Sequence, residues 1–261
     1  MARVIAVANQ KGGVGKTTTC VNLAFALTEA NRRVLLVDLD PQGNATLGCG
    51  VDSRAVDLTS GEVLLGDATI DEAQIKLEAL GFSLVPGNTS LTAAEVQLME
   101  MLARERRLRD AIDPVRDRYH HILIDCPPAL NMLTVNALTA ADGVLIPMQC
   151  EYYALEGLTS LLDTVKRIRE AVNPDLQLEG LLRTMYDVRN NLSNEVSNQL
   201  IKHFGEKVYR TIVPRNVRVA EAPSHGEPVI CYDPSSRGAI AYLGLAGEML
   251  RRERLQAAGA H

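Results

Sequence analysis

The sequence predicts an α/β fold in which a mostly parallel sheet is covered by helices on both faces. Apolar runs bounded by turn residues alternate along the chain with helical patterns, an alternation typical of parallel sheets. Apolar residues make up 46% of the chain, yet aromatic residues reach only 4% and tryptophan is absent. A core built from Leu, Ile, Val and Ala suits helices packed on a sheet that is buried on both faces.

The predicted strands are short apolar runs that end in turn residues or carboxylates. They lie at Val4–Ala8, Val34–Val37, Phe82–Val85, Ile122–Ile124, Gly143–Pro147, Leu178–Leu182 and Val208–Ile212. Helical spacing of apolar residues predicts helices at Thr17–Ala30, Leu91–Ile112, Ala154–Val172, Ser193–Phe204 and Ser236–Leu255. Residues 49–80 show the least regular pattern. No linker or internal repeat is evident, so we expect one domain over residues 1–261.

Charge and cysteine content exclude several classes of protein. The net charge of -5 is not that of a protein coated in nucleic acid, although it leaves room for a local basic patch. The five cysteines lack a C-x-x-C pair, so we expect neither a disulfide framework nor a zinc site, and a reducing cytoplasm fits. We also expect no signal peptide and no membrane-spanning segment, because no apolar run reaches about 18 residues.

A glycine-rich segment stands between the first predicted strand and the first predicted helix. It comprises Lys11, Gly12, Gly13, Val14, Gly15, Lys16, Thr17 and Thr18. Glycines allow successive backbone N–H groups to surround an anion, and the start of a helix adds partial positive charge. Lys16 is expected to reach the β- and γ-phosphates of a nucleotide, and the Thr17 hydroxyl to bind Mg²⁺. The pattern therefore predicts a P-loop nucleotide triphosphatase domain.

The segment departs from the common pattern G-x-x-x-x-G-K-[ST] at its first position, where this chain has Gln10. A second lysine, Lys11, stands just before the glycine pair. The ordinary loop needs one lysine, so Lys11 indicates either a second phosphate contact or a contact to the nucleotide of a neighbouring subunit. The guanine-reading sequence N-K-x-D is absent, which favours ATP as the nucleotide.

Two predicted strands end in carboxylates, at the edge where such sheets bind ligands. Asp125 closes the apolar run Ile122–Ile124 and is expected to hold Mg²⁺, usually through water. Asp38 and Asp40 lie two residues apart and point the same way if the strand continues. One would support the metal, with Asp38 as the first candidate, and the other would orient or activate the attacking water. The alternative is an ordinary acidic turn, because a proline and a glycine follow.

These motifs together resemble the ParA/Soj family of chromosome- and plasmid-partitioning ATPases over nearly the whole chain. The resemblance rests on the deviant Walker A motif Asn9–Thr18 and on the segments Asp38–Asn44, Ile124–Pro128, Val213–Arg218 and Glu221–Gly226. The glutamine that breaks the general loop pattern is usual in this family. Because the first strand begins almost at residue 1, we expect the small chromosomal type, without the N-terminal helix-turn-helix region of the larger plasmid type.

The resemblance implies a mechanism and a set of partners. Lys11 would reach across a nucleotide-sandwich dimer to the partner's ATP, and Asp40 would be needed for hydrolysis. The adenine would lie against Pro214 and Asn216, with Arg215 near the nucleotide. The ATP-bound homodimer would bind double-stranded DNA without sequence preference, on the nucleoid in the cytoplasm. A ParB-like partner at a centromere-like site would stimulate a slow basal hydrolysis.

A basic face is predicted in the last third of the chain. Between Arg183 and Arg218 the sequence has seven basic and three acidic residues, within a chain whose net charge is negative. The resemblance favours Arg189 and Arg218 as the leading DNA contacts, and the further candidates are Lys202, Lys207 and Arg210. Aromatic residues are not arranged for base stacking, so binding should be sequence-blind and salt-dependent. The alternative is an ordinary solvated surface.

Two other classes of protein share this loop. A MinD-like ATPase would bind membranes through a C-terminal amphipathic helix. The tail Met249–Ala258 has three arginines but no Phe, Trp or Lys, so we favour the frayed end of a core helix and expect no membrane contact. The second rival is a reductase with an iron–sulfur cluster, or a biotin-pathway ligase. A bridging cluster would need two cysteines such as Cys126 and Cys150, and the position of Cys126 in a turn favours packing instead.

Overall fold

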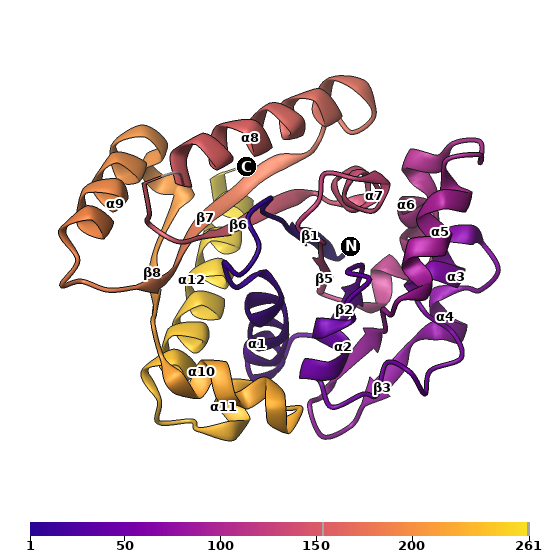
Figure 1. Ribbon diagram of the computed structural model, residues 1–261, viewed down its shortest axis with the longest axis horizontal. Helices are drawn as coiled ribbons and strands as arrows, with labels where there is room; N and C mark the ends of the chain where they lie inside the picture. The colour runs from indigo at the N-terminus through magenta and orange to yellow at the C-terminus, as the bar shows by residue number, and fades with distance from the viewer. Residues whose placement is uncertain (153, 260–261) are drawn as a thin grey trace.

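A computed structural model describes residues 1–152 and 154–259, and within these ranges its centre is an eight-stranded sheet (Figure 1). The strand order is β3-β4-β2-β5-β1-β6-β7-β8. Neighbouring strands are parallel except β3 and β4, which pair antiparallel. The strands are β1 (Arg3–Val7), β2 (Val34–Asp38), β3 (Ile75–Leu77), β4 (Phe82–Val85), β5 (His121–Asp125), β6 (Gly143–Met148), β7 (Gln177–Tyr186) and β8 (Val208–Pro214).

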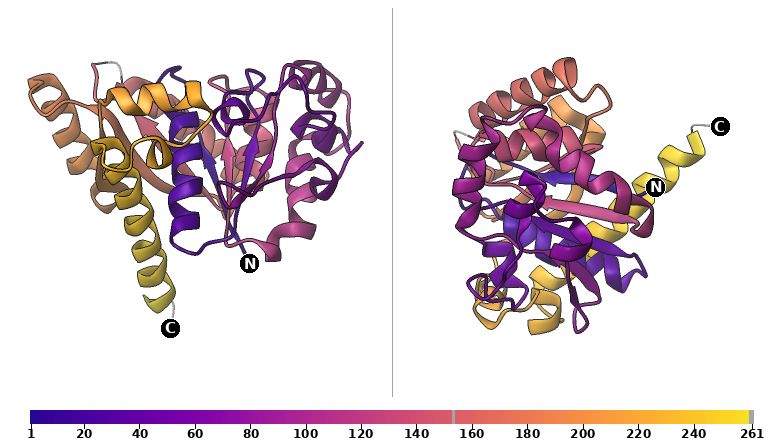
Figure 2. Two further views of the ribbon diagram at one scale, coloured as in Figure 1. Left: turned by 90° about the horizontal axis from the view of Figure 1, so that it is seen from below. Right: turned by 90° about the vertical axis from the view of Figure 1, so that its right-hand side faces the viewer.

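Helices pack on both faces of the sheet, which confirms the predicted α/β fold class (Figure 2). One face carries α1 (Lys16–Glu29), α11 (Val229–Tyr232) and α12 (Arg237–Gly259). The other carries α3 (Ser60–Leu65), α5 (Ser90–Leu98), α6 (Arg107–Ile112), α7 (Met132–Ala140), α8 (Ala154–Ala171) and α9 (Asn191–Phe204). Shorter helices are α2 (Asn44–Gly48), α4 (Ile70–Ala73) and α10 (Val217–Glu221), with 3-10 turns at Arg104–Arg106, Asp113–Arg118, Gly205–Lys207 and Ala222–His225.

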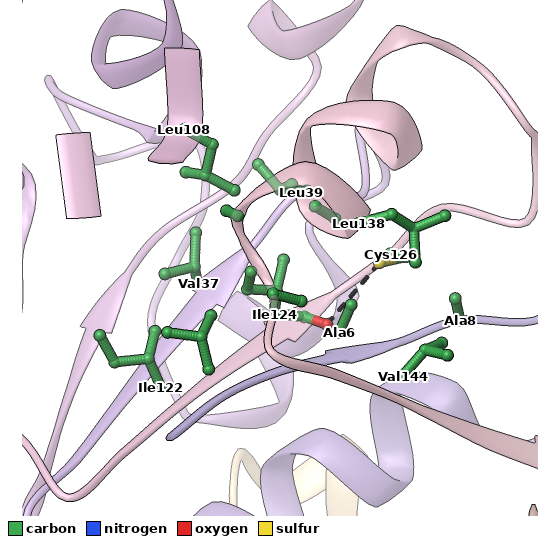
Figure 3. Packing of buried hydrophobic residues seen from close by; sticks show 14 of the residues in the cluster. Ala6, Ala8, Val37, Leu39, Leu108, Ile122, Ile124, Cys126, Leu138 and Val144 are labelled. Atoms are coloured by element: carbon green, nitrogen blue, oxygen red, sulfur yellow. Dashed lines mark hydrogen bonds between the residues drawn. The ribbon is translucent and has the colours of Figure 1, made fainter. Parts of the chain in front are cut away.

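Alternate side chains of the central strands enter two separate hydrophobic clusters. In β5, Ile122 and Ile124 point into the cluster on the α7 face, whereas Leu123 points into the cluster on the α1 face. All three side chains are fully buried. Figure 3 shows the first cluster, where Leu108 of α6 and Leu138 of α7 lie over the strands. This alternation is what a sheet covered on both faces requires.

The predicted long helix at Leu91–Ile112 is wrong. The structure has α5, which ends at Leu98, and then a 3-10 turn before α6. Between them Ala103 has a φ of +52°, a left-handed conformation that cannot continue a right-handed helix. Neither glycine nor proline marks the break in the sequence, so the helical spacing of apolar residues predicted one continuous helix across it.

The residues predicted as least regular, 49–80, contain two short helices and the edge strand β3. Each helix begins with a capping box, at Thr59 with Glu62 and at Thr69 with Glu72. This Thr-x-x-Glu pattern is a helix-start signal that the prediction overlooked. The prediction also lacked α7, and it ended both β7 and β8 too early along the chain.

A buried cluster around Tyr209 joins the outer strands β7 and β8. The Tyr209 hydroxyl donates to Glu179 at 3.1 Å, and the Arg252 guanidinium carbon lies 4.0 Å from the ring centre. A Cβ added at Gly180 of β7 would approach this ring at 2.5 Å and the Lys207 carbonyl at 2.9 Å. Because Tyr209 is fully buried, with its hydroxyl bonded to Glu179 and its ring beneath Arg252, the ring cannot shift without disturbing these contacts.

We expect Gly180→Ala to lower the free energy of unfolding by about 1–3 kcal/mol, the usual cost of overpacking a filled core. The matched control is Gly157→Ala in α8, where an added Cβ would meet no described atom within 4 Å. Removing a helix glycine should stabilise that variant by about 0.5–1 kcal/mol. Urea unfolding of both variants measures the difference. An unfolding midpoint of Gly180→Ala equal to that of the parent would contradict the packing around Tyr209.

Candidate functional site

The glycine-rich loop connects β1 to α1, as predicted, at the edge where the parallel strands end (Figure 1). Gly13 and Gly15 have φ angles of +70° and +89°, a left-handed conformation that favours glycine. A Cβ added at Gly12 or Gly13 would meet no described atom within 4 Å, so the loop surface is open there. The loop borders a cavity of about 620 Å³, a size that suits a small-molecule ligand.

The start of α1 places Lys16 and its neighbours on this cavity. Lys16 is only 6% exposed, and its Nζ donates to the Lys11 carbonyl at 3.3 Å. The side chain therefore folds back over the loop, from where an ammonium group can contact phosphate oxygens. Val14 is buried in the core instead. The other loop residues on the cavity wall are Gly12, Gly13, Gly15, Thr17 and Thr18.

Asp125 ends β5 beside the loop and is fully buried. Its Oδ1 accepts a hydrogen bond from the Cys20 thiol at 3.5 Å, and the nearby Thr17 hydroxyl lowers the pKa of the carboxyl. No described residue donates to Asp125 Oδ2. A buried carboxylate oxygen without a donor is costly, and a cation would relieve that cost. The Thr17 hydroxyl and the Asp125 carboxylate therefore fit Mg²⁺, which prefers oxygen ligands.

The described residues include no cluster of three or more His, Cys, Asp or Glu side chains that could hold a metal alone. A magnesium ion at Thr17 and Asp125 would therefore need water or phosphate oxygens to complete its shell. That arrangement is usual for Mg²⁺ bound with a nucleotide, because the ion keeps several waters and few protein ligands.

Asp38 ends β2 and lies opposite Asp125 in the sheet register. Its Oδ2 accepts from the Thr46 N–H at 2.9 Å and the Thr46 hydroxyl at 2.7 Å, and its Oδ1 accepts from the Asp40 N–H at 3.1 Å. Asp40 lines the cavity, and its Oδ1 accepts from the Gln42 N–H at 2.9 Å. Asp38 therefore positions the segment that carries Asp40, while its role at a metal stays a prediction.

Burial raises the pKa values of the two strand-end carboxyls. The pKa of Asp125 is raised by burial to about 8, and the neighbouring charge of Asp38 adds to the effect. Burial also raises the pKa of Asp38 to about 6, although the hydrogen bonds from Thr46 and Asp40 oppose this. Neighbouring buried carboxylates disfavour each other's charge. A divalent cation close to Asp125 would stabilise the ionised form.

The second lysine of the loop, Lys11, is not among the residues that line the cavity. Its Nζ forms an ion pair with Glu151, and the two side chains are 48% and 50% exposed. Nearby, the Asn9 amide donates to the Pro147 carbonyl at 2.8 Å, and Gln10 donates to a serine of α8 at 3.1 Å. The start of the loop is thus tied to β6 and α8, with Lys11 at the rim.

The residues predicted to contact the base follow β8 but do not line the phosphate-loop cavity. Pro214 and Arg215 line a neighbouring cavity of about 700 Å³, together with Arg189 and Arg237. Asn216 caps α10, since its Oδ1 accepts a backbone N–H of that helix at 3.3 Å. The wall of the phosphate-loop cavity also includes Met185, Pro223, Ser224 and Glu227, to none of which the sequence analysis assigned a role in the site.

The end of β7 contacts the loop although no sequence motif marks it. The Thr184 hydroxyl donates to the Val14 carbonyl at 2.7 Å. Met185 has a φ of +48°, and its sulfur accepts from the Gln149 amide at 2.7 Å. A left-handed backbone is uncommon for a long side chain, and such strain gathers at functional sites. Met185 is therefore a site residue that sequence reasoning missed.

The predicted DNA-binding residues fall into two groups along the outer strands, and their role in binding DNA stays a prediction. Beyond the C-terminal end of β7, Arg189 pairs with Asp187 at 2.9 Å, and beyond the C-terminal end of β8, Arg218 pairs with Glu221 at 2.9 Å. The other candidates lie nearer the start of β8, in the last turn of α9, in the 3-10 turn after it and in the first half of the strand. They are Lys202, which is exposed, and Lys207 and Arg210, which border a separate cavity.

Arg183 contributes to the charge excess of this segment but not to the surface. It is 6% exposed and donates to the Ser197 hydroxyl and the Tyr209 carbonyl, each at 2.8 Å. The basic excess on the surface is therefore smaller than the sequence count suggests.

The two cysteines considered for a bridging cluster are both buried, Cys126 fully and Cys150 with 4% exposure. The Cys126 thiol donates to the Ile124 carbonyl at 3.8 Å (Figure 3). Both side chains belong to the hydrophobic cluster on the α7 face. The arrangement supports a packing role, since a cluster shared by two subunits needs thiols at the surface.

This geometry defines a P-loop protein, because a lysine folds over a glycine loop beside a strand that ends in a buried carboxylate. The model of a family described as AAA domain matches residues 2–178. The chain is 50% identical to the chromosome partitioning protein ParA of Caulobacter vibrioides over 254 residues, which are 97% of this chain and 95% of that protein. It is also 50% identical to the sporulation initiation inhibitor protein Soj of Bacillus subtilis, over 95% of this chain and 98% of that protein.

The chain therefore belongs to this P-loop ATPase family, among the ParA/Soj partitioning proteins. Among solved structures it is 40% identical to a cobyrinic acid a,c-diamide synthase from Mycobacterium smegmatis with bound ADP and magnesium, at a TM-score of 0.85, covering 97% of this chain and 96% of that one. It is 27% identical to the cell division ATPase MinD of Pyrococcus furiosus, at a TM-score of 0.79, covering 96% and 99%. The identity to ParA and Soj exceeds both values over a similar length.

We expect Asp125→Asn to stabilise the nucleotide-free protein, and increasingly so as the pH rises from about 4 to about 8. Between the unfolded pKa of about 4 and the folded pKa of about 8, the folded state holds a proton that the unfolded chain releases. The contribution of Asp125 to the free energy of unfolding therefore falls as the pH rises through this window. The amide of Asp125→Asn does not titrate, so the variant does not lose this part of the free energy of unfolding.

Melting curves of Asp125→Asn and the parent across this pH range measure the effect. The control is Asp175→Asn, because Asp175 is exposed and its change should leave the pH dependence unaltered. A gap in melting temperature that stays constant or narrows from pH 4 to pH 8 would contradict the account of Asp125.

Proposed function

We propose that this chain is an ATP-dependent DNA-partitioning ATPase, in which Mg-ATP closes a homodimer that binds DNA. The observation that carries the proposal is the pair of lysines on one loop. Lys16 folds over the loop and is buried, whereas Lys11 stands half exposed at the rim in a surface ion pair. Such a pair is weak and easily exchanged. Since one lysine serves the phosphates of its own loop, the second is available for a nucleotide on a facing subunit.

Mg-ATP is the proposed ligand of the phosphate-loop cavity. Lys16 would contact the β- and γ-phosphates, while Thr17 and Asp125 would hold Mg²⁺ and Asp40 would orient the attacking water. The ion would neutralise charge on the transferring phosphoryl group. The Asp125 oxygen without a donor supports this assignment, as does the ADP and magnesium bound by the M. smegmatis relative.

Basal turnover should be slow. No arginine lines the cavity among the described residues. A positive charge supplied to the transferring phosphoryl group can raise the rate about 10³-fold or more. A ParB-like partner could therefore raise this slow rate of hydrolysis, and hydrolysis would release the DNA.

The dimer would form by the approach of two phosphate loops. In the isolated chain a Cβ at Gly12 meets no described atom within 4 Å, so nothing in the described chain itself requires glycine there. A facing loop from a second copy would require it. Lys11 would then exchange the Glu151 carboxylate for the partner's phosphates, to which charge-assisted bonds are strong.

The DNA-binding part of the proposal rests on the cluster beyond β8. Arg189, Arg215 and Arg237 border one cavity, and Arg218 follows in α10. A single chain with a net charge of -5 makes few phosphate contacts, and joining two copies doubles their number. DNA affinity should therefore depend on dimerisation and fall with salt. The protein would accordingly lie on the nucleoid in the cytoplasm.

The structure offers less support for a MinD-like membrane role. None of the described helices combines the length and apolar character that crossing a membrane requires. A membrane-binding tail would need a free end of α12. Instead Glu248 accepts backbone N–H groups of β8, and Glu253 lies 2.9 Å from His121 Nε2. These contacts tie α12 to the rest of the chain as far as Glu253, and the exposed residues 254–258 beyond it include no Phe, Trp or Lys that would favour a membrane interface.

The phosphate and dimer roles are tested by two lysine variants. Lys16→Ala should weaken ATP binding at least about tenfold, because it removes a charge-assisted contact worth about 1.5–3 kcal/mol. Lys11→Ala should bind ATP as the parent does but remain a monomer. Calorimetry measures the affinity and light scattering the mass. Unchanged ATP affinity in Lys16→Ala would contradict the phosphate site, and ATP-dependent dimers of Lys11→Ala would contradict the trans contact.

The DNA role is tested by charge reversal at each end of β8. Arg189→Glu and Arg218→Glu should abolish DNA binding and leave ATP-driven dimerisation intact. The matched control, Lys207→Glu, reverses a charge in the other cluster and should retain most of the affinity. Fluorescence anisotropy with a DNA duplex at about 50 and about 200 mM salt measures binding. Equal losses in all three variants, or binding that salt does not weaken, would refute this assignment.

A further inference from the structure

The loop between β5 and α7 leaves the sheet at Asp125 and reaches the phosphate-loop cavity through Pro128. Its first residues, Asp125 and Cys126, are fully buried, whereas residues 128–130 are exposed. The loop is thus fixed at one end by the strand. Its position at the cavity depends on what fixes the other end, where α7 begins.

That second end is held by Glu95 of α5. Glu95 Oε2 accepts from the Asn131 side-chain amide at 2.9 Å, and Oε1 accepts from the Met132 backbone N–H at 3.2 Å. Asn131 Oδ1 in turn accepts from the Thr134 N–H at 3.2 Å. The Thr134 hydroxyl donates to the Ala129 carbonyl at 2.6 Å. A chain of hydrogen bonds therefore runs from α5 into the exposed part of the loop.

A carboxylate suits this position electrostatically. Met132 is the first residue of α7, and the N–H groups of a first helical turn carry partial positive charge and lack partners within the helix. Glu95 satisfies one of these groups and orients Asn131, which caps another. Glu95 itself is not among the residues that line the phosphate-loop cavity. Any effect on bound nucleotide must therefore pass through the loop.

We propose that Glu95 is a positioning residue for ATP hydrolysis, which fixes the far end of the loop that follows Asp125 and carries Pro128. This inference rests on the proposed ATPase function. Misplacement of a reacting group by about 1 Å can slow an enzyme about 10²-fold. ATP binding is less sensitive, because Lys16 and the glycine backbone belong to a different loop, between β1 and α1, and have no contact with Glu95 among the described hydrogen bonds.

Glu95→Ala should lower kcat about tenfold while the ATP dissociation constant stays within about twofold of the parent value. Glu95→Gln keeps an acceptor for the Met132 N–H but turns its own amide toward Asn131. Its kcat should therefore lie between the kcat of the parent and that of Glu95→Ala. The matched control is Glu100→Ala, which removes the same charge from an exposed position just beyond α5. Equal kcat values in Glu95→Ala and Glu100→Ala, or an ATP affinity that falls as much as kcat, would overturn the proposal.

Hydrogen exchange separates this inference from the proposed function. In the nucleotide-free protein, Glu95→Ala should speed exchange at the amides of residues 132–134 at least about tenfold, while Glu100→Ala exchanges as the parent does. Unchanged exchange would overturn the anchor whatever the activity. Faster exchange in a chain whose parent hydrolyses no ATP would support the anchor and refute the proposed function instead.

Discussion

The burial of two carboxyl groups at the ends of adjacent strands is the constraint on which the candidate site depends. Asp38 and Asp125 lie opposite each other in the register of β2 and β5, and burial raises the pKa of both. Both carboxyl oxygens of Asp38 accept hydrogen bonds, from Thr46 and from the Asp40 N–H, whereas Asp125 keeps one oxygen without a donor in the described chain. The glycine loop and the start of α1 supply positive potential at the same edge. A phosphate with its divalent cation would complete this balance.

The loops at this edge are tied to one another rather than to a single element. Thr184 of β7 bonds to the middle of the phosphate loop, Asn9 bonds to the end of β6, and Glu95 of α5 holds the start of α7. The strands β1, β2, β5, β6 and β7 thus contribute to one cavity wall or support it. Within this frame Lys16 is enclosed and Lys11 stands at the rim, as the proposed contact of Lys11 to a facing subunit requires.

Sequence reasoning succeeded for continuous local patterns, although it overlooked the capping boxes of α3 and α4, and it failed where a residue's role depends on tertiary structure. Buried strands appear as continuous apolar runs, and the phosphate loop is a run of consecutive residues, so both could be predicted. The break at Ala103 carries neither glycine nor proline, so a helix was predicted through it. Arg183 counts as surface charge in the sequence, yet folding buries it against β8. Met185 and Glu95 matter only because of strand order and helix packing, which no short motif records.

The most direct measurement of the central claim is a crystal structure with a non-hydrolysable ATP analogue and Mn²⁺ in place of Mg²⁺. We expect an anomalous scattering peak about 2 Å from the Thr17 hydroxyl and about 4 Å from Asp125 Oδ2, with one water between the ion and Asp125. Lys16 Nζ should move from the Lys11 carbonyl to the phosphates of the analogue. A metal bound elsewhere, or an analogue outside the glycine loop with Asp125 Oδ2 still facing no cation, would contradict the account.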